Sequence, residues 1–231
     1  RALGVFAPGA PFRVEAAATV LDRPPAGARR ALHALDQAAF LHASPLPLSG
    51  AHRQMHRLLH YLAHELVDDD PEREAYAGRH ACFYAEGTRP IRQEQNSPGW
   101  PIAVGELLPD LPNVRHGQAW AAAHSHPLTV EYFLNLSPYQ VAIRDLARDR
   151  AWGQAALPIV EANPERLSAL DRLTFYAEVP TTDLDQQRAY LERALTIARE
   201  EMGDKSTSYQ VYALCWLARF LYDEAGKAME A

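Results

Sequence analysis

Residues 40–55, FLHASPLPLSGAHRQM, constrain the fold most, because they interrupt helical patterns that lie on both sides of them. Their first three residues, FLH, are predicted as a short extended segment. The prolines, serine and glycine that follow are typical of a turn, and a second short strand fits after that turn. Apolar residues recur at helical spacing in residues 12–22, 26–39 and 57–67. The sequence therefore predicts two helices, a pair of short strands and a third helix.

This order of elements is the pattern of a small winged-helix domain. The third helix carries an apolar stripe of Leu58, Leu59, Leu62 and Leu66. The sequence DDDPERE then offers an aspartate cap and a proline in the first turn, which predict a further helix over about residues 71–86. We expect the winged-helix domain and this following helix to occupy residues 1–87.

The rest of the chain is predicted to be helical, after an interruption. Residues 87–101, GTRPIRQEQNSPGWP, are rich in glycine, proline and polar residues and are predicted as a loop at a domain boundary. Residues 88–127 would form a linker and a junction helix. Helical pieces are expected near residues 128–150, 151–162, 164–178, 183–202 and 206–225. Successive short helix pairs over residues 128–231 indicate an α-superhelical region. The predicted fold class is mainly α with a small β-wing.

Composition limits the classes of function. The chain has 231 residues, 48% of them hydrophobic, and a formal net charge of -6. An acidic balance argues against broad nucleic-acid affinity, which needs clustered positive charge. Only two cysteines occur and no apolar run reaches membrane-spanning length, so we expect a reducing, cytoplasmic location and no membrane partner. The chain begins at Arg1, inside RALGVFA, and we expect a fragment of a longer protein.

Histidines at every fourth position from residue 52 to residue 64 raise the question of a metal site. Two imidazoles four residues apart on a helix can share a zinc ion. In HYLAHE, however, Glu65 follows the second histidine, unlike the H-E-x-x-H motif. A second pair, in HSHP at residues 124–127, resembles the zinc motif of JAMM-type isopeptidases but lacks the aspartate that this motif requires. We predict no metal and no catalytic residues, and no phosphate-binding glycine loop is present. Trp120, Trp152 and Trp216 are predicted as core anchors.

Several segments, in order, are similar to a known family. FAPGAPFRVEAAATVL, LHALDQAAFLH, QMHRLLHYLAHEL and RHACFYAE resemble the winged-helix segment of STAND signal-transduction ATPases of the NB-ARC and maltose-regulator type. YLERALTIAREEMG and LARFLYDEAGKAMEA resemble the tetratricopeptide arrays that follow it in such proteins. The resemblance implies a winged helix and tetratricopeptide-like repeats without the ATPase domain, and therefore no enzyme activity in this chain.

The resemblance also assigns a role to one histidine. Met55, His56 and Arg57 fall on the family's MHD motif, whose histidine contacts the β-phosphate of bound ADP. It implies that His56 contacts ADP in the full-length protein, where ADP or ATP would be held by an upstream ATPase domain. Arg57 departs from the motif's aspartate. His52, His60 and His64 would then be wing and solvent-face residues, and the helical repeats would bind an unidentified ligand or protein.

Two alternatives stay open. The first is a DNA-binding transcription regulator whose recognition helix, within residues 26–39, carries Arg29, Arg30 and His33. Two arginines are few for a helix that reads the major groove. The second is a zinc-dependent hydrolase that uses His60 and His64, or the HSHP segment.

Overall fold

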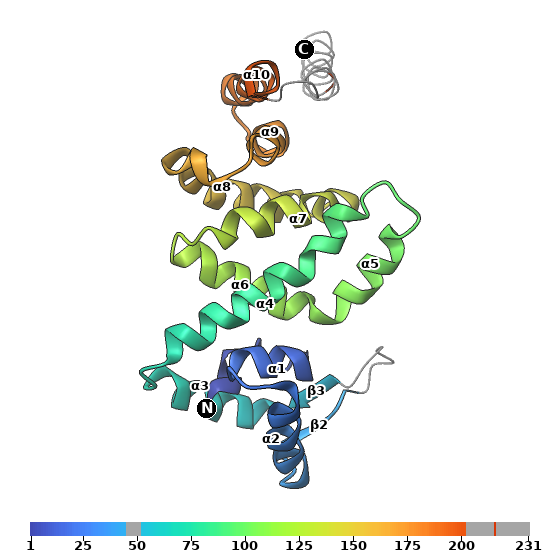
Figure 1. Cartoon of the computed structure of the whole chain (residues 1–231), viewed down its shortest axis with the longest axis vertical. Coiled ribbons are helices and arrows are strands. Elements are labelled where there is room, and N and C mark those ends of the chain that lie inside the picture. Colours follow the sequence, from blue (N-terminus) through green and yellow to red (C-terminus); the bar gives the residue numbers. More distant parts are fainter. Residues whose placement is uncertain (45–51, 202–214, 216–231) are drawn as a thin grey trace. The chain divides into compact units, whose positions relative to one another are not determined.

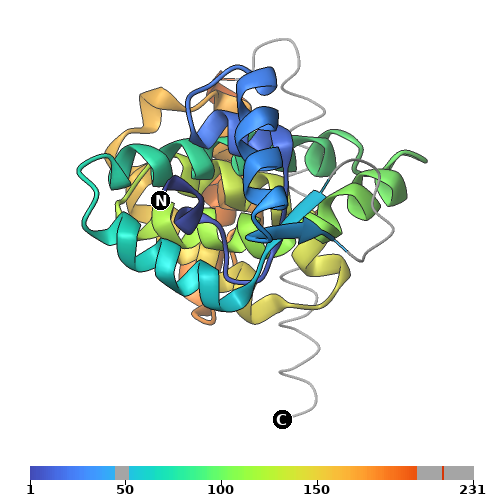
Figure 2. The same cartoon turned by 90° about the horizontal axis from the view of Figure 1, so that it is seen from below.

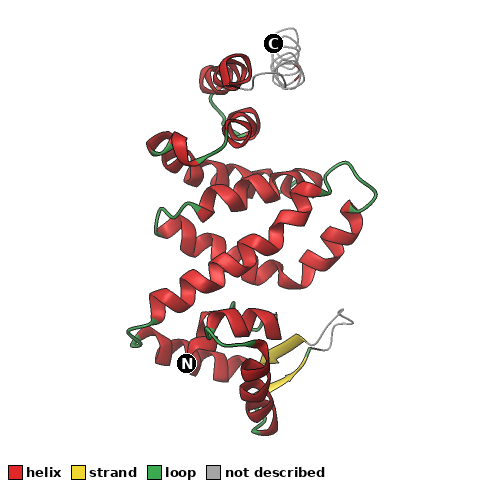
Figure 3. Cartoon of the chain, viewed as in Figure 1, coloured by secondary structure: helices red, strands yellow, loops and turns green. Residues whose placement is uncertain are grey.

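The computed structural model describes residues 1–44, 52–201 and 215, and divides the chain into two compact units. Unit 1 comprises Arg1–Asn135 and unit 2 comprises Leu136–Ala231. The described residues are mainly helical, with one small antiparallel sheet, as Figures 1 and 3 show. The coarse prediction of a mainly α fold with a small β element is thereby confirmed. No helix in the described ranges is long and apolar enough to cross a membrane.

Unit 1 begins with the predicted order of helices and strands. Its first elements are the 3-10 helix η1 (Ala2–Val5), β1 (Pro11–Arg13), α1 (Val14–Val20), α2 (Pro25–Gln37), β2 (Leu41–Ala43), β3 (His52–Met55) and α3 (Arg57–Asp68). Pro25 occupies the first turn of α2, where its missing N–H costs nothing. At the other end, Ala39 adopts a positive φ of 60°, and the Phe40 N–H bonds to the Leu35 carbonyl at 2.9 Å. This Schellman-type end turns the chain directly into β2.

The sheet has three strands in the order β1-β3-β2. Both pairings are antiparallel: Phe12 lies opposite Arg53 on one side of β3, and His42 lies opposite Gln54 on the other. Figure 2 shows β2 and β3 next to the end of α2. The strands β2 and β3 were predicted, but β1 was not. Residues 12 and 13 were expected to be helical, and instead they pair with β3.

Aromatic rings and one amide hold the N-terminal segment to the later helices of unit 1. Phe6 stacks on Phe12 with ring centroids 4.5 Å apart and meets the His80 ring edge-on at 5.1 Å. Asn113 accepts the Ala7 N–H and donates to the Pro11 carbonyl, both at 2.8 Å. Because all of these groups are buried, they form part of the core of unit 1.

The remaining helices of unit 1 are α4 (Arg73–Gln93), α5 (Trp100–Leu107) and α6 (Leu111–Ala123), with the 3-10 turn η2 (Leu108–Asp110) before α6. The predicted loop at residues 87–101 is wrong for most of its length, since α4 runs through Pro90 to Gln93 and α5 begins at Trp100. Thr88 and Ile91 are buried, and this burial stabilises a helix that glycine and proline would otherwise weaken.

Close contact between α4 and α6 depends on a glycine. A Cβ atom at Gly117 would lie 2.4 Å from the Tyr132 hydroxyl oxygen and 3.1 Å from the Ala81 Cα. The same hydroxyl donates a 2.7 Å hydrogen bond to the Ala81 carbonyl, and both residues are buried. Any side chain at position 117 would therefore separate α6 from its neighbours.

The helix α3 presents the opposite face to that expected. Its buried residues are His60 and Val67, and it packs against η1. Three of the four leucines of the predicted apolar stripe face water instead: Leu58 is 71% exposed, Leu62 51% and Leu66 42%, whereas Leu59 is partly buried. The reason is Gly4, whose missing side chain lets η1 approach the α3 backbone on the histidine side, where a Cβ would lie 2.4 Å from the Ala63 carbonyl oxygen.

The described residues of unit 2 form helices joined by short turns and loops. The helix α7 (Leu128–Ala142) crosses from unit 1, and α8 (Leu146–Ala162), the 3-10 turn η3 (Pro164–Arg166), α9 (Ala169–Glu178) and α10 (Leu184–Glu201) follow. The helical pieces were predicted, although the break between α7 and α8 comes at residues 143–145 rather than near residue 150. The helices α9 and α10 pack together. The helix predicted at residues 206–225 lies outside the described residues, apart from residue 215.

Candidate functional site

The four regularly spaced histidines occupy four different environments. His52 lies on β3 and His60 on α3, and both side chains are buried, at 7% and 2% exposure. Their prediction as wing and solvent-face residues is therefore wrong in its solvent exposure. His64 is half-exposed, with Nδ1 3.1 Å from a carboxylate oxygen of Asp68. Only His56 stands at a helix end.

His60 is committed to the backbone of η1. Its Nε2 lies 2.7 Å from the Phe6 carbonyl oxygen, which can only accept, so Nε2 carries the proton. Burial lowers the pKa of His60, partly offset by this hydrogen bond. The other nitrogen, Nδ1, is buried without a partner among the described residues. His60 therefore serves as a neutral core residue that fastens η1 to α3.

His56 caps the N-terminus of α3. Its Nδ1 accepts a 3.3 Å hydrogen bond from the Leu58 N–H, and its side chain is exposed. Because Nδ1 accepts, the proton of the neutral ring must reside on Nε2. His56 thus offers one exposed N–H donor at the positive end of a helix dipole, an arrangement that favours an anion.

Arg57 adds a permanent charge beside this donor. Its Nη2 donates to the Tyr61 hydroxyl at 3.4 Å, and its guanidinium lies 5.9 Å from the centre of the Tyr61 ring. The hydrogen bond to Tyr61 raises the pKa of Arg57, which is exposed. Arg57 therefore places beside this donor a cation that would attract a phosphate group.

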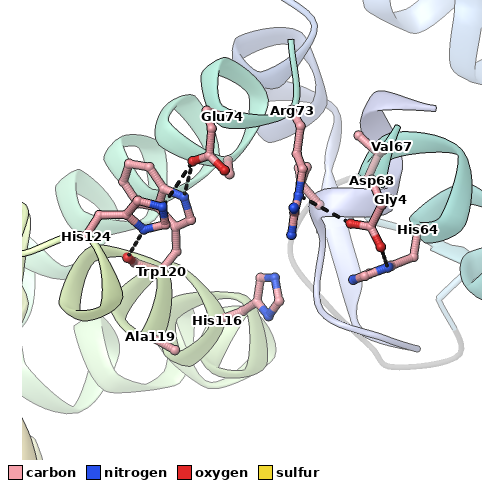
Figure 4. A pocket seen from close by; sticks show the side chains of 12 residues that line it. Gly4, His64, Val67, Asp68, Arg73, Glu74, His116, Ala119, Trp120 and His124 are labelled. Atoms are coloured by element: carbon pink, nitrogen blue, oxygen red, sulfur yellow. Dashed lines mark hydrogen bonds and ion pairs between the residues drawn. The ribbon is translucent and has the colours of Figure 1, made fainter. Parts of the chain in front are cut away.

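A pocket of about 200 Å³ opens in unit 1 between η1, α3, α4 and α6. Figure 4 shows ionisable side chains and one tryptophan around it. Trp120 was predicted as a core anchor, but it is only partly buried and lines the pocket. Its indole N–H donates to Glu74 at 3.1 Å, and its ring stacks on His124 at a centroid distance of 4.7 Å.

His116 enters this pocket from α6, opposite Arg73 of α4 (Figure 4). Although water reaches the imidazole through the pocket, the surrounding protein atoms lower the pKa of His116, and His64 and His60 lower it further. Behind it lies His80, whose ring centroid is 5.7 Å away. Burial lowers the pKa of His80 to about 3, so this ring is neutral at physiological pH.

The residues named for a zinc hydrolase are not brought together as a metal site. Across the ranges that the structure describes, no three His, Cys, Asp or Glu side chains are arranged to hold a metal ion. In the HSHP segment, His124 is bonded to the Trp120 carbonyl and to Glu74, at 2.8 and 3.2 Å. His126 accepts the Leu128 N–H at the start of α7. Each pair of histidines therefore has structural partners instead.

Comparison with known proteins gives no assignment. No family model, curated protein or solved structure matches this chain. The candidate site therefore rests on geometry: His56 and Arg57 at the start of α3, and the pocket around Arg73 and His116. Sequence reasoning singled out His56 but missed the pocket. Arg73 and His116 stand far apart in the sequence and belong to no shared motif, so only the packing of α6 against α4 reveals their proximity.

Proposed function

We propose that this chain is the regulatory portion of a STAND-class NTPase. Residues 1–68 act as a winged-helix domain, and the helices of unit 2 act as a tetratricopeptide-like sensor region. The winged helix holds the ADP-bound resting state of an upstream NTPase domain, which carries any hydrolytic chemistry. A ligand or protein that binds the sensor region then shifts the balance between closed and open states.

The observation that carries this proposal is the hydrogen bonding of His56. Because Nδ1 accepts the hydrogen bond from the Leu58 N–H, the exposed Nε2–H is available to donate to a phosphate oxygen. Arg57 and the α3 dipole add favourable field at the same place. The order of helices and strands before α3 also supports a winged helix.

The exposed leucines of α3 support docking onto another domain. Leu58, Leu62 and Leu66 form an apolar face on the helix that His56 caps. An apolar patch beside a polar binding group is typical of an interaction surface. In this proposal the face meets the NTPase domain when His56 reaches the nucleotide. The short helices α8, α9 and α10, of which α9 and α10 pack together, support a repeat-like sensor region.

The test is the rate at which the full-length protein releases ADP. Replacing His56 with Ala should speed the release of a fluorescent ADP analogue roughly tenfold or more, the worth of one hydrogen bond to a charged group. His42→Ala is the matched control, since His42 is an exposed histidine on the neighbouring β2. Unchanged release from His56→Ala would contradict the proposal, as would the lack of a phosphate-binding loop upstream in the gene.

A DNA-binding winged helix is the second candidate, because Arg29, Arg30 and His33 are all exposed on α2. Arg29 lies within 3.9 Å of Glu15, which offsets part of its charge. A mobility-shift assay at physiological salt separates the two functions. Binding of duplex DNA that is lost on replacing Arg29 and Arg30 with Gln would favour this candidate over the first.

A further inference from the structure

The pocket of unit 1 has two carboxylates that are already engaged. Asp68 faces Arg73 and His64, with Arg73 Nε and His64 Nδ1 at 3.2 and 3.1 Å from its two oxygens. A single oxygen of Glu74 faces the Trp120 indole N–H at 3.1 Å and His124 Nε2 at 3.2 Å. Figure 4 draws these four contacts on opposite sides of the pocket. The acids of the pocket thus serve to orient its donors.

The nitrogens left over converge on the same space. The Arg73 guanidinium uses Nε for Asp68, and its far end points toward the His116 ring (Figure 4). His64 bonds through Nδ1, so its Nε2 remains for another partner. The side-chain nitrogens that can still bind a ligand in the pocket therefore come from three different helices: His64 from α3, Arg73 from α4 and His116 from α6.

We propose that this pocket binds a small oxyanion, a phosphate or carboxylate group, held by Arg73, His116 and His64. An arginine with free terminal N–H groups recognises such planar or tetrahedral oxyanions through paired hydrogen bonds. The volume of about 200 Å³ admits a small organic acid or a phosphorylated fragment but no larger nucleotide. The site lies at the other end of α3 from His56, and nothing in the proposed ADP contact depends on it.

The charges in the pocket should couple the binding of the anion to the uptake of a proton. His124 faces two acceptors, the Trp120 carbonyl and Glu74. Arg73 is a permanent cation in the pocket and pairs with Asp68. An anion then adds a negative charge to the pocket, which a proton taken up by His116 would neutralise. That proton would also turn a ring nitrogen from an acceptor into a donor.

The other ionisable groups around His116 do not compensate the anion. His60 of α3 and His80 of α4 lie behind the ring, and their lowered pKa values keep both neutral at physiological pH. From η1 only Gly4 and Val5 line the pocket, and neither is ionisable. We therefore expect His116, which faces the pocket, to take up a proton on anion binding, and the affinity to increase as the pH falls.

The experiment titrates the chain with sulfate, whose double charge does not change between about pH 6 and pH 8. Proton NMR signals of the histidine rings report where sulfate binds. We expect saturable shifts of His116 and His64, with an affinity several-fold higher at the lower pH. Arg73→Gln and His116→Gln should each weaken binding at least tenfold, the usual loss for one charge-assisted hydrogen bond.

Three variants make the outcome specific. Arg150→Gln removes an exposed arginine of unit 2 and should leave binding unchanged, as should His42→Gln. His56→Ala shows whether the shifts of His116 and His64 arise from an anion in this pocket or from one at the N-terminus of α3. Circular dichroism and urea unfolding check that the Arg73 and His116 variants stay folded. If only one of them folds, that variant alone is enough to test the site.

Phosphate and malonate are titrated separately at about pH 6. Tighter binding of phosphate would indicate a phosphorylated ligand, and tighter binding of malonate would indicate a carboxylate. The proposal fails if none of these anions shifts His116 and His64 at either pH. It also fails if Arg73→Gln and His116→Gln both bind sulfate as the parent chain does. Loss of the shifts only in His56→Ala would assign the anion to the α3 N-terminus and overturn the pocket site, whereas failure of the ADP-release test leaves this site unaffected.

Discussion

At the scale of single residues, regular spacing does not give the histidines a common role. His56, His60 and His64 share one side of α3, yet one caps the helix, one is buried and one pairs with Asp68. Sequence could place His56 at the helix start because a turn and a strand precede it. It could not predict the burial of His60, because the Phe6 carbonyl that fixes this ring lies 54 positions away in the chain.

His80 makes the stability of unit 1 sensitive to acid. Its ring is 1% exposed and packs against Phe6 and Tyr84. Burial lowers its pKa from the ordinary 6.5 to about 3. Between these two pH values the unfolded chain binds a proton at His80 that the folded chain does not bind. The contribution of neutral His80 to the free energy of unfolding is complete above pH 6.5. Below that pH this contribution decreases by about 1.4 kcal/mol for each pH unit, until the pH reaches the pKa of His80 in the folded chain.

We therefore expect the free energy of unfolding of unit 1, measured by urea denaturation, to fall as the pH decreases from about 7 to 4. His80→Gln, which cannot charge, should cost stability at pH 7 but flatten this slope. His33→Gln, at an exposed position on α2, should keep the full slope. A slope that is identical in His80→Gln and the parent chain would show that other groups control the acid response.

At the scale of elements, helical periodicity located most helices but not the buried face of α3. The stripe of α3 looked like a core face because four leucines share it, yet η1 covers the opposite side. The same limit explains residues 87–101, where glycine and proline indicated a loop. Burial of Thr88 and Ile91, which depends on partners distant in sequence, outweighs that local preference.

This contrast predicts unequal costs for two leucine truncations. Leu62→Ala removes a side chain that is 51% exposed and should change the free energy of unfolding by less than about 0.5 kcal/mol. Leu195→Ala on α10, where the side chain is 8% exposed, should cost roughly 2–5 kcal/mol.

Equilibrium urea unfolding of the two variants and the parent chain measures both values. Leu217, which the sequence predicts to be buried like Leu195 in the helix at residues 206–225, lies outside the described residues, but α10 already packs against α9. Equal losses for the two variants would mean that the exposed face of α3 is covered in solution or that α10 is not part of a stable core.

At the scale of the whole molecule, the two units differ in how their buried ionisable groups are paired. Unit 1 buries imidazoles and the carboxylate of Asp110, which forms an ion pair with Arg13. Unit 2 buries the carboxylate of Asp149, which is 3% exposed in the first turn of α8. Neither the division into units nor these groups could be predicted from net charge or composition. Both depend on how the helices pack and on which polar residues that packing encloses. Asp149 stands in LARDRAWG, among charged residues that are usually exposed.

Asp149 should make unit 2 lose stability as the pH rises from about 4 to about 7. Burial raises its pKa from 3.8 to about 7, opposed by a hydrogen bond with Ser137, while Glu178 and Asp145 raise it further. The folded unit therefore keeps a proton that the unfolded chain releases above about pH 4. Its stabilisation is complete below that pH and is lost as the pH rises to about 7, by as much as roughly 4 kcal/mol.

Asp149→Asn keeps a polar side chain that can bond Ser137 but cannot ionise, so it should be more stable than the parent chain at pH 8 and close to it at pH 4.5. Pulse proteolysis in urea, with peptides of unit 2 identified by mass spectrometry, measures this unit separately from unit 1. Asp185→Asn is the matched control, since Asp185 is an exposed aspartate in the first turn of α10. If Asp149→Asn is no more stable than the parent chain at pH 8, the buried carboxylate is not charged there, or its charge is neutralised by a group that faces it only in solution. Any loss of stability of unit 2 between about pH 4 and about pH 7 would then have to come from another residue.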